Sequence, residues 1–179
     1  MLTYDEALKK IENFMLESNI RSFCSEVCQG ACCGDCYDSQ NACFRNEGRR
    51  ITCSVFVCRD LQNILGCRVF NYKFTDLIYH IYETVHCNMG QTPEGFIRSP
   101  YFYPHTEEIK SRCNFDESYF EILEPLIPEI IEAFKATYPH TVVSHNPTRF
   151  RSLRKWCEPS KLKERFEEWQ KKFKEEGMN

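Results

Sequence analysis

Residues 24–36 read Cys24-Ser25-Glu26-Val27-Cys28-Gln29-Gly30-Ala31-Cys32-Cys33-Gly34-Asp35-Cys36. This stretch begins a cluster of cysteines: nine of the twelve in this 179-residue chain lie between residues 24 and 67. Gly30, Gly34 and Gly48 interrupt residues 22–67, which show no sustained helical period. The segment therefore predicts an irregular loop wrapped around a bound group, with a pattern that turns helical or mixed from about Leu61.

The remainder of the chain shows mostly helical patterns. Apolar residues recur at helical spacing over residues 3–18, 75–86, 118–138 and 160–176. A capping box of Thr3 and Glu6 opens the first helix, and Thr75 is the expected cap of the second. Pro125 and Pro128 predict a break in the third. The β-branched residues of 51–58 predict one short strand.

These patterns predict a mainly α fold with a small β element. The length fits a single domain over residues 1–179, made of a cysteine-rich lobe at 22–67 and a mostly helical remainder at 68–179. Hydrophobic residues make up 42% of the chain and aromatic residues 14%, which is enough for an ordinary core. The net charge of −3 gives no basic field that would attract nucleic acid or an acidic membrane.

The N-terminus predicts a cytoplasmic protein. Asp5 and Glu6 stand where a secretory signal would carry basic residues, and no apolar run of membrane-spanning length occurs in the sequence. In a reducing compartment, clustered cysteines indicate metal ligands rather than disulfides. A hyperthermophilic source would favour disulfides instead.

Several thiols held close together need a positive charge, because thiolates repel one another. Arginines are the only cationic residues between positions 24 and 67, and the acidic residues there outnumber them. A bound metal deprotonates the sulfurs and offsets their charge, so residues 22–67 are predicted to be a metal-binding lobe. The candidate ligands are Cys24, Cys28, Cys32, Cys33, Cys36, Cys43, Cys53, Cys58 and Cys67.

The spacing of these cysteines favours iron–sulfur over zinc. Structural zinc sites usually combine two CxxC or CxxH pairs, whereas this lobe has one CxxC, Cys33 to Cys36, and no histidine. Cys28, Cys33 and Cys36 have the C-x4-C-x2-C spacing of plant-type ferredoxins. Thiolate ligation at irregular spacing therefore predicts an iron–sulfur cluster, of the 4Fe–4S type, in one or two copies. Zinc is the alternative metal.

The start of the lobe also resembles a known family. Its C-x3-C-x-G-A-C-C run is similar to the opening of the CxxCxxCC family of zinc- or iron-chelating proteins, with one more residue in each gap before Cys32-Cys33. Cys53-Ser54-Val55-Phe56 and Cys58-Arg59-Asp60-Leu61 are similar to its second cysteine set. The resemblance covers residues 24–61. It implies metal binding through Cys24, Cys28, Cys32, Cys33, Cys53 and Cys58, and leaves the biochemical role open.

The functional prediction is an iron–sulfur protein that acts in electron transfer, cluster-dependent catalysis or redox sensing, with a redox partner protein. The alternatives are a zinc-stabilised module that binds protein or RNA and a metal carrier. Residues 149–156 alternate cations with aromatics and are the candidate contact for nucleic acid, although a solvated amphipathic turn explains them as well.

Residues outside the lobe add little to this prediction. Cys87, Cys113 and Cys157 are isolated and are expected to be small buried residues. His86, beside Cys87, is a further ligand candidate. The sequence carries no nucleophile elbow and no phosphate-binding loop, so it assigns no enzymatic reaction.

Overall fold

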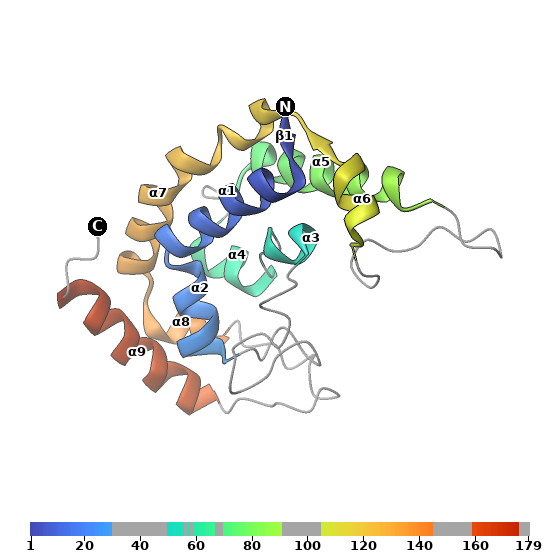
Figure 1. The fold of residues 1–179 in the computed structure, drawn as a ribbon. Coiled ribbons are helices and arrows are strands. Elements are labelled where there is room, and N and C mark those ends of the chain that lie inside the picture. The colour runs from blue at the N-terminus through green and yellow to red at the C-terminus, as the bar shows by residue number, and fades with distance from the viewer. Residues whose placement is uncertain are drawn as a thin grey trace. The chain divides into compact units, whose positions relative to one another are not determined.

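The computed structural model describes residues 1–29, 50–55, 57, 59–66, 70–90, 105–144 and 159–175 (Figure 1). Helices make up most of these residues, which confirms the mainly α fold. The elements are β1 (Leu2–Thr3), α1 (Tyr4–Glu17), α2 (Ile20–Ser22), the π-helix η1 (Phe23–Cys28), α3 (Ile51–Ser54), α4 (Arg59–Leu65), α5 (Tyr72–Met89), α6 (Glu107–Arg112), β2 (Asn114–Phe115), the 3-10 helix η4 (Glu117–Phe120), α7 (Leu123–Ala136), α8 (Pro139–Ser144) and α9 (Pro159–Glu175).

The chain divides into two compact units. The first comprises residues 1–15, 49–56 and 70–126, and the second comprises residues 16–48, 57–69 and 127–179. Within the described residues, no helix combines the length and the apolar character that crossing a bilayer requires.

The first unit packs around α5, which contacts α3, α6, β2 and η4. Strands β1 and β2 pair antiparallel, with Leu2 opposite Phe115. This is the small β element, and it lies outside the residues predicted as a strand. The capping box at α1 is confirmed, because the Thr3 N–H donates to Glu6 Oε2 at 2.9 Å and the Glu6 N–H donates to Thr3 Oγ1 at 3.4 Å. Phe14 of α1 packs on Phe74 of α5, with ring centroids 6.0 Å apart.

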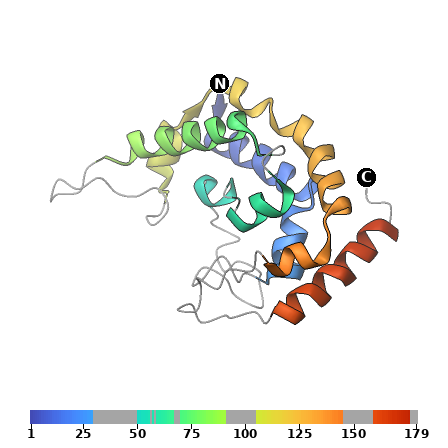
Figure 2. The same cartoon turned by 180° about the vertical axis from the view of Figure 1, so that it is seen from behind.

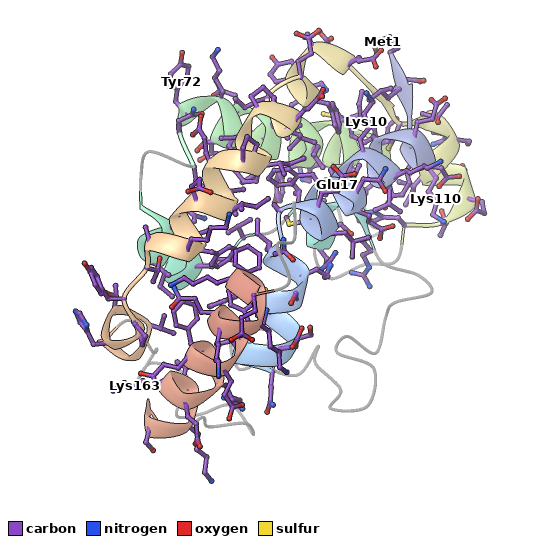
Figure 3. All side chains as sticks on the ribbon, turned by 90° about the vertical axis from the view of Figure 1, so that its left-hand side faces the viewer. Met1, Lys10, Glu17, Tyr72, Lys110 and Lys163 are labelled. Atoms are coloured by element: carbon purple, nitrogen blue, oxygen red, sulfur yellow. The ribbon has the colours of Figure 1, made fainter. Side chains whose placement is uncertain are left out.

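The second unit is built on an aromatic core. Phe23 of η1 stacks on Phe134 of α7 at 5.2 Å, and Trp169 of α9 lies 5.0 Å from both Phe134 and Phe173. Helix α9 lies against α8 and η1, as Figures 1 and 2 show from opposite sides. The predicted apolar stripe of α9 is confirmed, since Leu162, Phe166, Trp169 and Phe173 are all buried. Its opposite face is charged, with Lys163 exposed to solvent (Figure 3).

The predicted strand at 51–58 is wrong, because Ile51–Ser54 form the helix α3. The N–H groups of Cys53 and Ser54 donate to the Arg50 carbonyl, both at 2.9 Å, and the Ile51 N–H donates to the Tyr4 hydroxyl. Ile51 and Ser54 are fully buried. Tertiary contacts thus override the β propensity of a short run of β-branched residues.

The prediction of an irregular loop is also wrong for residues 23–28, which are π-helical. The helix α4 agrees with the helical or mixed pattern expected from about Leu61. Because η1 is short and its hydrogen bonds join residues five apart, it lacks the 3.6-residue period by which a helix is found in a sequence. Residues 30–49 lie outside the described part of the chain.

Two helix boundaries differ from the sequence prediction. Helix α5 begins at Tyr72, because the Asn71 side chain accepts the N–H groups of Lys73 and Phe74; Thr75 is not the cap. The predicted break in 118–138 lies before Leu123, where η4 gives way to α7, and Pro128 is inside α7. Pro128 is tolerated there because it lies on the exposed face, where water can satisfy the carbonyl that it leaves unpaired.

Candidate metal centre

The structure describes three of the nine candidate ligands. Cys24 and Cys28 belong to the second unit, and Cys53 belongs to the first. The six others lie outside the described residues: Cys32, Cys33, Cys36, Cys43, Cys58 and Cys67. The isolated Cys157 and residues 149–156 lie outside them as well.

Cys24 and Cys28 lie one helical turn apart on η1. In a π-helix, hydrogen bonds join residues five apart, so a spacing of four is slightly less than a turn and places both cysteines on the same side. Gln29 ends this turn in a left-handed conformation (φ 48°), and its N–H donates to the Cys24 carbonyl. Both cysteines are half-buried. The geometry of the pair therefore allows both thiols to bind one metal centre at the start of the cysteine-rich segment.

The residue before each of these cysteines is held in the core. Phe23 and Val27 have exposed fractions of 1% and 0%, respectively. Phe23 packs against Phe134, and edge to face against Phe166 and Trp169. The two buried apolar residues are thus four positions apart, as the two cysteines are, and each precedes its cysteine by one position. Burial of the apolar pair fixes the direction in which the thiols leave the helix.

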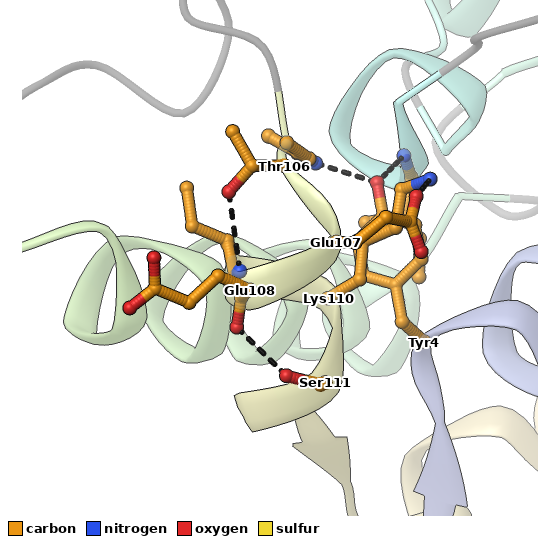
Figure 4. Close-up of polar contacts among 9 residues, drawn as sticks. Tyr4, Thr106, Glu107, Glu108, Lys110 and Ser111 are labelled. Atoms are coloured by element: carbon orange, nitrogen blue, oxygen red, sulfur yellow. Dashed lines mark hydrogen bonds and ion pairs between the residues drawn. The ribbon is translucent and has the colours of Figure 1, made fainter.

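Cys53 stands on α3 beside a buried polar group. Tyr4 accepts the Ile51 N–H at 2.9 Å, and its hydroxyl lies 2.5 Å from His105 Nδ1 (Figure 4). A hydrogen bond thus joins the two side chains, and the tautomer of His105 decides which of them donates. Burial raises the pKa of Tyr4 above its usual value of 10.0, although the Ile51 hydrogen bond lowers it. The charges of Cys113 and Cys53 raise it further.

The Tyr4–His105 pair could not be found from the sequence. The two residues are 101 positions apart, and no motif joins them. His105 has an exposed fraction of 7% and Tyr4 of 2%, so this hydrogen bond is shielded from water. It joins the start of α1 to the residue before the cap of α6, within the first unit.

Cys113 is a structural residue. Its exposed fraction is 1%, and burial raises the pKa of its thiol to about 11, which keeps it protonated at neutral pH. The expectation of a small buried residue is therefore confirmed for Cys113. It is wrong for Cys87, which is exposed in the last turn of α5. His86 stacks on Tyr82 with ring centroids 5.9 Å apart.

His80 also has a structural role. Its Nε2 accepts the Asp116 N–H at 3.0 Å, and its ring stacks on Tyr119 with centroids 4.2 Å apart. Burial lowers the pKa of His80, against the opposing effects of Asp116 and Glu83. The lone pair that would bind a metal is thus occupied in the fold.

Within the described ranges, no three or more histidine, cysteine, aspartate or glutamate side chains converge so as to hold a metal ion. No family model, curated protein or solved structure matches the chain. The resemblance of residues 24–61 to the CxxCxxCC family thus stays a prediction. Metal binding is inferred from the number of cysteines in residues 24–67 and from the placement of Cys24 and Cys28.

Proposed function

We propose that this chain is an iron–sulfur protein whose cluster is held by thiolates from residues 24–67. The observation that carries the proposal is the pair Cys24 and Cys28, two half-buried thiols on the same side of one π-helical turn. π-helical turns occur frequently at functional sites. The buried Phe23 and Val27 hold this turn against the core, which fixes the side of the turn on which Cys24 and Cys28 lie.

The chemistry of the donors favours a metal. Two thiolates one turn apart repel each other, and Glu26 adds a carboxylate between them in the sequence. A cationic centre offsets the negative charge of both thiolates and so removes this repulsion. The remaining ligands would come from the other cysteines of the lobe. With thiolates as the only soft donors and no histidine between residues 24 and 67, the donor set suits an iron–sulfur cluster better than a two-knuckle zinc site.

The proposed roles are electron transfer, cluster-dependent catalysis and redox sensing. Cluster binding needs the ligand thiols in the reduced form, and we propose the cytoplasm, where thiols stay reduced and metal ligation outcompetes disulfide formation. A cluster that transfers electrons also needs a redox partner protein. When bound, the cluster would supply one-electron chemistry, and the chain would supply its ligands and its shielding from water.

Anaerobic purification followed by metal and sulfide analysis tests the proposal. A brown protein that contains iron and acid-labile sulfide is expected. Colourless, iron-free protein would refute the iron–sulfur assignment, and stoichiometric zinc in its place would favour the zinc-stabilised module.

Two variants test the ligands directly. The double variant Cys24→Ser/Cys28→Ser should lose iron and visible absorption. Cys87→Ser is the matched control, because Cys87 is exposed on α5 outside the lobe, and this variant should keep both. Unchanged iron content in the double variant would exclude the two cysteines as ligands.

A further inference from the structure

A chain of hydrogen bonds connects α9 to the turn that carries Cys24 and Cys28. The Trp169 indole Nε1–H donates to Ser22 Oγ at 2.6 Å. The Ser22 hydroxyl in turn donates to Glu26 Oε1 at 2.7 Å. Ser22 thus accepts one hydrogen bond and donates another, which uses its donor and one acceptor position. All three residues belong to the second unit.

The residues of this hydrogen-bond chain on η1 and α2 flank Cys24 in the sequence. Ser22 lies two residues before Cys24, and Glu26 lies midway between Cys24 and Cys28. The indole that donates the first hydrogen bond also packs edge to face on Phe23, with centroids 5.7 Å apart. Trp169 therefore contacts this segment through a polar atom and through its ring. Both contacts act on the backbone that aims the two thiols.

A π-turn needs such external support. Its hydrogen-bond pattern is rare compared with that of the α-helix, and an insertion of this kind persists where tertiary contacts favour it. A slip of η1 into the α-helical register would rotate the cysteines relative to Phe23 and Val27. The Trp169–Ser22 hydrogen bond and the burial of Phe23 oppose that slip.

We propose that Ser22 and Trp169 are positioning residues for the metal centre, so that metal binding at Cys24 and Cys28 and the packing of α9 on η1 stabilise each other. The inference rests on the proposed function, because it needs a metal at these two thiols. The coupling is reciprocal: if α9 packing increases metal affinity, the metal increases the stability of α9 packing by the same factor.

Zinc alone, added to the reduced, metal-free full-length chain, is the probe for affinity. Competition with a chromophoric chelator gives the apparent Kd. Ser22→Ala and Trp169→Phe each remove the hydrogen bond, and the second keeps an aromatic ring in place. Each should weaken zinc binding about three- to tenfold, the range expected for one hydrogen bond between partly buried groups. Ser22→Thr keeps the hydroxyl and should restore affinity to within about twofold of the native value.

Gln170→Leu is the matched control. Gln170 is the neighbour of Trp169 on α9, and its Nε2 donates to the carbonyls of Phe134 and Thr137 at 2.8 and 2.9 Å. The variant removes hydrogen bonds from α9 to Phe134 and Thr137 but keeps the contacts of Trp169 with η1, so it should leave zinc affinity near the native value. Equal weakening by Gln170→Leu and Ser22→Ala would show that only general stability matters, and would overturn the positioning role.

Hydrogen exchange gives a second readout. Amides of residues 159–175 should exchange severalfold more slowly after zinc is added to the native chain, and this slowing should be lost in Ser22→Ala. Zinc binding without slower exchange in α9 would overturn the coupling and leave the metal centre standing. A native chain that binds neither zinc nor iron would overturn both. Purification with iron absent and zinc present would overturn the iron–sulfur assignment alone.

Discussion

Removal of the Tyr4 hydroxyl tests the packing of the first unit, because this one group is hydrogen-bonded to two buried partners. The variant Tyr4→Phe removes the acceptor of the Ile51 N–H and the hydrogen-bond partner of His105 Nδ1, and it keeps the aromatic ring. Ile51 is fully buried, and His105 has an exposed fraction of 7%. Neither group can turn to bulk water in the folded state.

The expected loss of stability follows from the loss of these two hydrogen bonds. A buried polar group that loses its partner costs about 1–3 kcal/mol, so the two together should lower the unfolding free energy by about 2–6 kcal/mol. That is a large part of the total of about 5–15 kcal/mol typical of native proteins. With a urea m-value of about 2 kcal/mol/M, the urea midpoint should fall by about 1–3 M.

Urea titration followed by circular dichroism measures this change. Tyr72→Phe is the control, since it deletes the same hydroxyl from a side chain that is 71% exposed, and it should alter stability by less than about 0.5 kcal/mol. If the two variants unfold at the same urea concentration, the Tyr4 hydroxyl does not connect α1, α3 and His105 in solution.

The same hydroxyl gives a pH signature. The pKa of Tyr4 is raised above 10.0 in the folded state, so the unfolded chain releases this proton first as the pH rises. The unfolded state then binds fewer protons, and the contribution of Tyr4 to stability is present below pH 10 and is lost progressively above it. Tyr4→Phe should therefore show a shallower alkaline decline than the native chain. An equal decline in both would contradict the assigned pKa shift.

Three further predictions follow from single contacts. Burial raises the pKa of Cys113 from 9.0 to about 11, so the contribution of this thiol to stability should be lost as the pH rises from 9 to 11. Iodoacetamide should modify the exposed Cys87 far faster than the buried Cys113, as measured by mass spectrometry. Equal labelling rates would contradict the burial of Cys113. Asn71→Ala removes the cap of α5 and should cost about 1 kcal/mol in urea unfolding, whereas Thr75→Ala should cost less, and the reverse order would restore Thr75 as the cap. Phe134→Ala, at the centre of the aromatic core, should cost about 3–5 kcal/mol, and a loss below about 1 kcal/mol would show that this core is not formed.

Local rules of sequence identified much of the helical fold. The capping box of Thr3 and Glu6 involves residues three apart, so it was predicted and is confirmed. The stripe of α9 is equally local, because the 3.6-residue period alone places its four apolar residues on one face. At residues 51–58 the same reasoning failed. The four residues of α3 are too few to show a helical period, and the β-branched side chains among them favour a strand. The helix forms because the Tyr4 hydroxyl and the Arg50 carbonyl accept backbone N–H groups of α3.

The sequence by itself determined the mainly α class, the boundaries of α1 and α9 to within two residues, and the grouping of cysteines that predicts a metal centre. Only the tertiary structure decided that Cys24 and Cys28 share one side of a π-turn. That register depends on Phe23 meeting Phe134 and Trp169, which lie more than a hundred residues away along the chain. Helical periodicity acts between neighbours, whereas this register is set by burial between distant segments, which no local pattern encodes.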